Sequence, residues 1–64
     1  MLYVNVVVFD GGSRVRVYSE GRMSFRDVMG RAVGIARRRG EEVDELSIRK
    51  VQRCEWTPDS KVTD

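Results

Sequence analysis

The chain has 64 residues, a net charge of +2, and charged side chains at 34% of its positions. A domain of about 60 residues buries only about 60% of the surface that its unfolded chain exposes, so the core must be small. One cysteine and no histidine exclude an internal disulfide and argue against a zinc site built from one chain. Self-association remains as a way to supplement such a core.

The first predicted structure is a β-hairpin. An apolar run at residues 6–9 meets Asp10-Gly11-Gly12-Ser13, and residues 14–18 alternate between arginine and apolar side chains. Adjacent glycines can take the positive φ angles that a two-residue turn requires. The pattern therefore predicts strands over residues 2–9 and 14–19, joined by a turn at Gly11-Gly12.

This turn sets an expected register in which the two faces of the hairpin differ. The face expected to meet a helix carries Leu2, Val4, Val6, Val8, Val15 and Val17. The other face combines aromatic and arginine side chains, which are enriched in protein interfaces and also bind single-stranded nucleic acid. The first candidate partner-binding surface therefore consists of Tyr3, Val7, Phe9, Arg14, Arg16 and Tyr18. The alternative is a solvent-facing sheet stabilised by its cross-strand pairs.

A helix is predicted after the loop at residues 20–22. Ser24 followed by Asp27 resembles a capping box, and Gly40 after three arginines is typical of a helix C-terminus. Apolar residues recur at the spacing of one helix face. These residues are Phe25, Val28, Met29, Ala32, Val33 and Ala36.

The outer face of this helix is the second candidate surface. Gly30 and Gly34 lie opposite the apolar face, and each interior glycine costs up to about 1 kcal/mol relative to alanine. A glycine stripe edged by arginines could admit a partner helix or a nucleic-acid backbone. The surface consists of Arg26, Gly30, Arg31, Gly34, Arg37 and Arg38. The alternative is that the two glycines are tolerated by drift and have no binding role, since the established role of G-x-x-x-G is in membranes.

An acidic loop at residues 41–45 precedes the last predicted element. Residues 46–56 are predicted as a third strand with a bulge near Arg49-Lys50, which brings Val51 to the core side. A short helical turn over residues 50–54 is the alternative. Cys54 is expected to be a small buried residue, and Trp56 is expected to close one end of the core or, if exposed, to anchor an interface.

The order ββαβ predicts a single α+β domain over residues 1–56, with a three-stranded sheet in the order 2-1-3 and one helix packed on one face. Residues 57–64 are expected to form a flexible polar tail. Eight arginines against three acids give residues 1–40 a charge of +5, whereas residues 41–64 carry −3.

No catalytic or cofactor motif is present, so the expected function is non-enzymatic, without cofactor, metal or evident small-molecule substrate. The leading hypothesis is a cytoplasmic protein-interaction module, a homodimer that acts as an adaptor or inhibitor on a larger protein, of the kind that phages and mobile elements encode. The alternative hypothesis is a nucleic-acid-binding module that uses the helix and sheet arginines. The sequence shows neither a targeting signal nor a membrane span.

Overall fold

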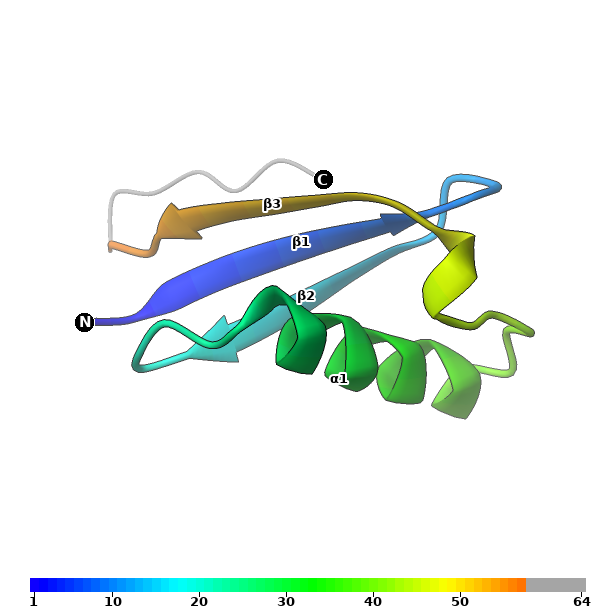
Figure 1. Ribbon diagram of the computed structural model, residues 1–64, viewed down its shortest axis with the longest axis horizontal. Helices are drawn as coiled ribbons and strands as arrows, with labels where there is room; N and C mark the ends of the chain where they lie inside the picture. The colour runs from blue at the N-terminus through cyan, green and yellow to red at the C-terminus, as the bar shows by residue number, and fades with distance from the viewer. Residues whose placement is uncertain (58–64) are drawn as a thin grey trace.

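The computed structural model describes residues 1–57, and the predicted tail lies outside them except for Thr57. Three strands form one sheet in the order β2-β1-β3, and both pairs are antiparallel. One helix lies against one face of this sheet (Figure 1). The elements are β1 (Tyr3–Phe9), β2 (Arg14–Ser19), α1 (Phe25–Arg38), the short 3₁₀ helix η1 (Glu45–Ser47) and β3 (Ile48–Glu55). The predicted α+β class, element order and strand order are confirmed.

The hairpin register differs from the prediction by one residue. Phe9 N–H donates to Ser13 C=O at 2.8 Å, so the turn holds three residues instead of two. Gly11 and Gly12 take φ values of 92° and 93°, which only glycine adopts without strain. Val7 consequently lies opposite Val15 instead of Arg16. Because side chains alternate along a strand, a shift of one residue exchanges the two faces.

On β1, the core side is therefore the side that was predicted to be open, whereas Val15 and Val17 of β2 face the core as predicted. Val7 and Phe9, predicted for the interface, are 0% exposed. The prediction that Val4, Val6 and Val8 would face the helix is wrong, because they alternate with Val7 and Phe9 along β1. One cluster joins the strands to α1 through Val7, Phe9, Val15, Val17, Val28, Ala32, Val33 and Ala36.

Helix α1 begins and ends as the sequence predicts. The Ser24 side chain accepts a hydrogen bond from Asp27 N–H at 3.2 Å, which satisfies one of the free donors of the first turn. At the other end, Gly40 has a φ of 88°. Gly40 N–H donates to Arg37 C=O and Glu41 N–H donates to Ala36 C=O, which together form a Schellman motif.

The third strand contains the predicted irregularity. Val8 pairs with Lys50 but Phe9 pairs with Ile48, so Arg49 is an extra residue in β3. This bulge places Val51 and Ile48 against the core cluster. The alternative of a helical turn over residues 50–54 is wrong. Residues 45–47, which were assigned to the loop and the strand, instead form η1, capped by the Asp44 side chain.

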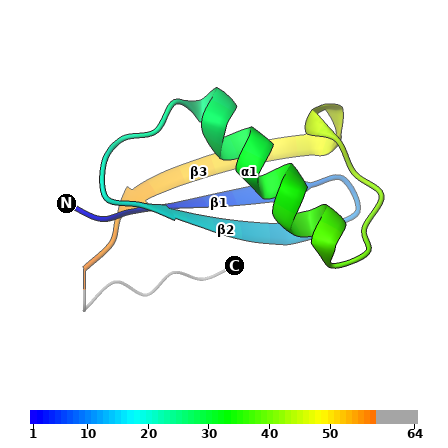
Figure 2. The same cartoon turned by 90° about the horizontal axis from the view of Figure 1, so that it is seen from below.

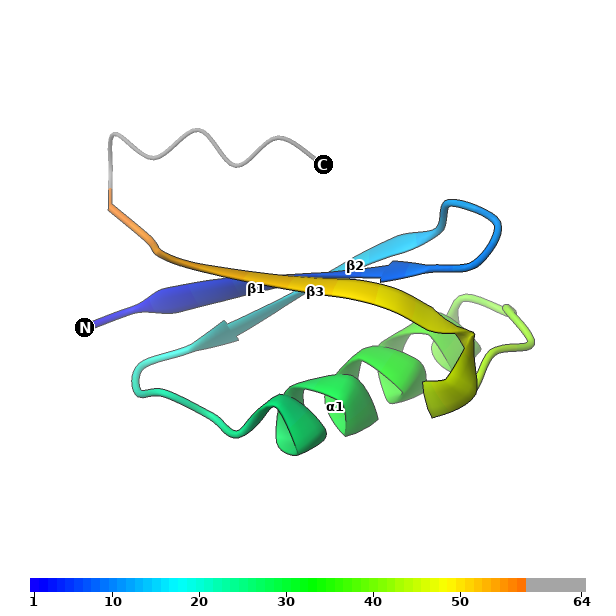
Figure 3. The ribbon, with the colours of Figure 1, turned by 45° about the horizontal axis from the view of Figure 1, so that its top comes forward.

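The helix crosses the sheet diagonally (Figure 2). Its first turn lies over β3 and its last turn lies over β2, and no helix formed by residues 1–57 lies on the opposite face of the sheet (Figure 3). Phe25 was predicted to belong to the core but is 51% exposed. The diagonal crossing explains this difference, since the helix begins at the margin of the sheet.

Candidate functional site

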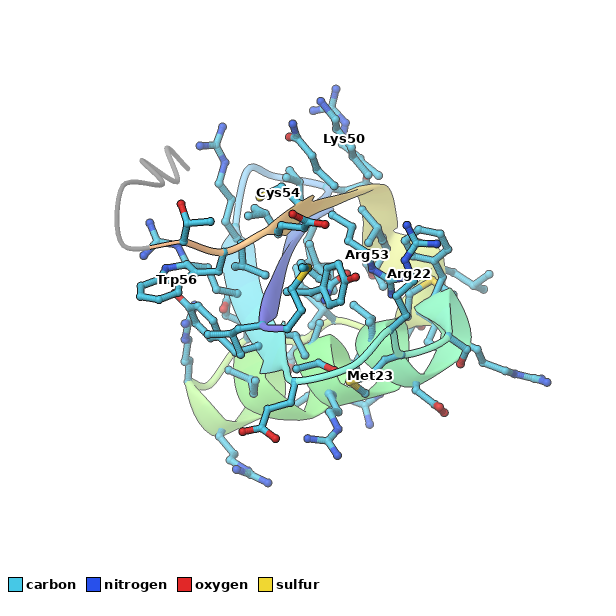
Figure 4. All side chains as sticks on the ribbon, turned by 90° about the vertical axis from the view of Figure 1, so that its left-hand side faces the viewer. Arg22, Met23, Lys50, Arg53, Cys54 and Trp56 are labelled. Atoms are coloured by element: carbon cyan, nitrogen blue, oxygen red, sulfur yellow. The ribbon has the colours of Figure 1, made fainter. Side chains whose placement is uncertain are left out.

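The face of the sheet that turns away from α1 is here called the open face. Its residues lie in cross-strand rows centred on β1: Val8 between Arg14 and Lys50, Val6 between Arg16 and Gln52, and Val4 between Tyr18 and Cys54. Figure 4 shows Lys50 and Cys54 on this side of β3, whereas Arg53 points to the helix side. The ladder continues to Trp56, whose N–H donates to Leu2 C=O at 2.8 Å. Alternation assigns the Trp56 side chain to the same face as Cys54.

The open face has an aliphatic centre and a basic, aromatic rim. Val4 and Val6 are buried although they lie outside the helix-side core cluster. Tyr18 is 47% exposed and Trp56 is 38% exposed. The rim cations are Arg14, Arg16 and Lys50, and none of the described strand residues on this face is acidic. The face therefore presents positive charge and two aromatic rings.

Half of the first predicted surface belongs to the open face. Arg14, Arg16 and Tyr18 lie on it, as predicted. Tyr3 does not, because it shares the helix side of β1 with the buried Val7 and Phe9. The sequence reading missed Lys50 and Gln52, since β3 had no assigned register from which their side could be read.

Cys54 and Trp56 also differ from expectation. Cys54 was expected to be buried, but the thiol is free and exposed. Trp56 was expected to close the core, but it is an exposed residue outside the core cluster. The alternative that treats an exposed Trp56 as an interface anchor stays a hypothesis.

The outer face of α1 brings together part of the second predicted surface. A shallow hollow of about 410 Å³ is lined by Gly30, Arg31, Gly34, Ile35 and Arg38. Arg37 does not line this hollow but lines a neighbouring one together with Gly30, and its Nε–H donates to Val43 C=O of the following loop at 2.9 Å. Arg26 is exposed but does not line the hollow around Gly30 and Gly34.

A polar cluster on the helix side was not foreseen in the sequence. Asn5 is 0% exposed; its Nδ2–H donates to Val17 C=O at 3.2 Å. Its Oδ1 accepts from Arg53 Nε–H at 2.6 Å. Arg53 Nη2 also donates to Met23 C=O, and the guanidinium carbon lies 4.5 Å from the centre of the Phe25 ring. Arg53 is therefore fixed by three neighbours that belong to three separate segments.

Beside this cluster is a hollow of about 400 Å³, lined by Tyr3, Arg22, Phe25, Arg53, Cys54 and Glu55. Arg22 lies over the Tyr3 ring at 5.9 Å. Figure 4 shows Arg22, Met23 and Arg53 on the same side of the sheet, near the start of the helix. The one signal in the sequence was an asparagine among the valines of a strand, because a buried amide requires hydrogen-bonding partners.

Comparison with known proteins adds no relative: no family model matches the chain, and neither the curated proteins nor the solved structures contain a significant match. Within residues 1–57, no helix is long and apolar enough to cross a membrane. The same residues contain no group of three or more histidine, cysteine or acidic side chains arranged to hold a metal ion.

Proposed function

We propose that this protein is a small non-enzymatic binding module that attaches through its open face to an acidic segment of a larger protein, as an adaptor or inhibitor. The observation that carries the proposal is the composition of that face. Arg14, Arg16 and Lys50 share this face with Tyr18 and Trp56, without an acidic side chain among the described strand residues there. A cytoplasmic setting belongs to the proposal, because the exposed Cys54 is unpaired.

The rim residue types support binding by a protein partner. Arginine, tyrosine and tryptophan are over-represented among residues whose truncation costs the most binding energy. Tyr18 and Trp56 are more than a third exposed, so each ring has free surface to bury against a partner. The cations of the rim accelerate encounter with a negatively charged segment, and this effect falls as salt rises.

Single-stranded nucleic acid is the second candidate, favoured by the same combination of flat rings and cations. Bases stack on aromatic side chains, while arginine and lysine neutralise the phosphates. The open face offers both on one side of a sheet. The arginines of α1, at Arg31 and Arg38, lie on the opposite layer of the molecule, and we do not assign them to this surface.

The experiment is an affinity capture from lysate of the native host, made with and without nuclease. The bait proteins are the wild type, Tyr18→Ala with Trp56→Ala, and Arg31→Ala as a control on the helix. Under the proposal, a defined protein remains bound after nuclease treatment, is lost with the open-face variant and is kept with the control.

Two results would contradict this proposal. If nuclease treatment abolishes capture, the open face binds nucleic acid and not a protein segment. Capture that is lost with Arg31→Ala and kept with the open-face variant assigns partner binding to the helix instead. A circular-dichroism melt of each bait shows that the open-face variant is folded, as expected for rings that contribute little to the core.

A further inference from the structure

We infer that the hollow beside Arg53 binds a small organic carboxylate with an apolar or aromatic body. This hollow lies on the helix side of the sheet, so the inference does not depend on the function proposed for the open face. The aromatic residues Tyr3 and Phe25 and the arginines Arg22 and Arg53 line it, together with Cys54 and Glu55. The chemistry follows from how each of these groups is held.

The Arg53 guanidinium is fixed in a way that leaves one edge for a ligand. Its Nε–H donates to Asn5 and its Nη2 donates to Met23 C=O. One flat side lies on the Phe25 ring. Among residues 1–57, Nη1 has no hydrogen-bonding partner, and Arg53 lines the hollow. Nη1 can therefore donate to an oxygen of a carboxylate that enters the hollow.

The buried Asn5 explains why Arg53 needs no rearrangement to bind. Asn5 is 0% exposed and is itself held by Val17 C=O at 3.2 Å. A donor whose position is set before the ligand arrives loses little conformational entropy on binding. Burial of the Asn5 amide is tolerated because both of its polar atoms are hydrogen-bonded, one to Val17 C=O and one to Arg53.

The second cation, Arg22, extends from the exposed loop before α1. It lies over the Tyr3 ring at 5.9 Å and lines the same hollow. Because Arg22 is exposed, it can adjust to the ligand while Arg53 stays fixed. One fixed and one adjustable guanidinium form a clamp for a single anionic group.

Charge and volume select the class of ligand. Two cations, Arg22 and Arg53, line the hollow and favour an anionic ligand. The acid Glu55 also lines the hollow, so a carboxylate with one negative charge is favoured over a phosphate monoester, which carries nearly two at neutral pH. A volume of about 400 Å³ falls in the range of small-molecule sites. Tyr3 and Phe25 supply a surface for a ring, since aromatic rings stack on one another.

The test is an NMR titration of ¹⁵N-labelled full-length protein that follows the Arg53 Nε–H signal and the Tyr3 amide. The probes are N-acetylphenylalanine, which represents the carboxyl end of a polypeptide, and benzoate, which represents a free aromatic acid. The amide of N-acetylphenylalanine has the same shape without the charge and serves as the control ligand. We expect saturable shifts with one or both acids and at least about tenfold weaker binding of the amide, since hydrogen bonds to a charged group are stronger than those to a neutral one.

Inorganic phosphate and three arginine variants complete the test. We expect Arg22→Gln to reduce acid affinity about tenfold, and Arg26→Gln, which removes an exposed helix arginine, to leave it unchanged. Arg53→Lys keeps the charge without the fork and should also weaken binding; its thermal melt shows whether the fold is kept. Acid and amide binding equally, phosphate binding more tightly than either acid, equal effects of Arg22→Gln and Arg26→Gln, or no shifts with either acid would each overturn the inference.

Discussion

Phe9 shows most directly how a single residue decides which face of the sheet is the core. It is 0% exposed and packs in the cluster beneath α1. Phe9→Ala should lower the free energy of unfolding by about 3–5 kcal/mol, because a buried ring is replaced by a cavity. Urea unfolding followed by circular dichroism measures this loss. For a domain of this size, the variant should be largely unfolded.

Tyr18→Ala is the matched control for the Phe9 prediction. Tyr18 is 47% exposed and lies on the open face. Its truncation should change the free energy of unfolding by less than about 1 kcal/mol, since an exposed cross-strand pair contributes little. A result in which Tyr18→Ala unfolds the protein and Phe9→Ala does not would restore the register expected from a two-residue turn.

The pair Asn5 and Arg53 makes a second prediction at the scale of residues. Asn5→Ala should lower the free energy of unfolding by about 1–3 kcal/mol, because it leaves Val17 C=O and Arg53 Nε–H without their partner. Arg53→Ala should destabilise as well, but the double variant should be less destabilised than the sum of the two. A double-mutant cycle in urea reports this coupling. Additive losses would show that the 2.6 Å contact between Arg53 and Asn5 contributes no energy.

At the scale of the helix, two glycines should respond to alanine with opposite signs. Gly34 lies within α1, and a Cβ added there meets no atom within 4 Å. Gly34→Ala should therefore stabilise the protein by about 0.5–1 kcal/mol. Gly40 ends the helix with a φ of 88°, so Gly40→Ala should destabilise by about 1 kcal/mol or more, since the left-handed conformation strains any residue with a Cβ.

Thermal melts of both glycine variants measure the difference, and each variant serves as the control for the other. A Gly40→Ala variant as stable as the wild type would mean that the Schellman motif is not formed in solution. A destabilising Gly34→Ala would mean that the groove around Gly30 and Gly34 is occupied by a segment that a methyl group displaces.

The ends of the helix and the bulge of β3 were predictable from the sequence because their signals are local, whereas η1 was missed. Ser24, Gly40 and the bulge at Arg49 each act within a few residues, and all three were located correctly. The assignment of the two faces of β1 failed because it depended on the length of the turn. The turn consists of three residues, Asp10, Gly11 and Gly12. The two glycines alone do not distinguish a two-residue turn from a three-residue turn.

The candidate sites were less predictable than the elements, because they depend on contacts between residues far apart in the chain. Asn5 and Arg53 are separated by 48 positions, and no local pattern relates them. Arg14, Arg16 and Tyr18 were placed on the open face because β2 was correctly assigned to that side. Lys50 and Gln52 join them only once the bulge fixes the register of β3.

At the scale of the whole molecule, the distribution of charge allows a prediction about self-association, which the sequence suggested from the small core. A dimer formed through the open face would bring Arg14, Arg16 and Lys50 of one copy close to those of the other. Salt screens such repulsion over about 10 Å at 0.1 M. Self-association should therefore strengthen as salt rises, whereas binding of an acidic protein or a nucleic acid should weaken.

Light scattering coupled to size exclusion, at low and high salt, measures this dependence. The variant Lys50→Glu supplies the control, because it reduces the repulsion and should make the dimer less dependent on salt. A dimer that weakens with salt would assign self-association to a different surface, with opposite charges in contact.

The position of the two ends of the sheet has a mechanical consequence. Tyr3 at the start of β1 lies directly opposite Glu55 at the end of β3, and Trp56 N–H bonds to Leu2 C=O. A force that pulls Tyr3 and Glu55 apart would act at right angles to the strands. It would load one pair of hydrogen bonds between β1 and β3 at a time. The hydrogen bonds between β1 and β3 would break one after another, starting at Tyr3 and Glu55, while the hairpin of β1 and β2 stays paired. Detachment of β3 in this direction should therefore need a lower force than a pull along the strands, which loads all the hydrogen bonds of the pair together.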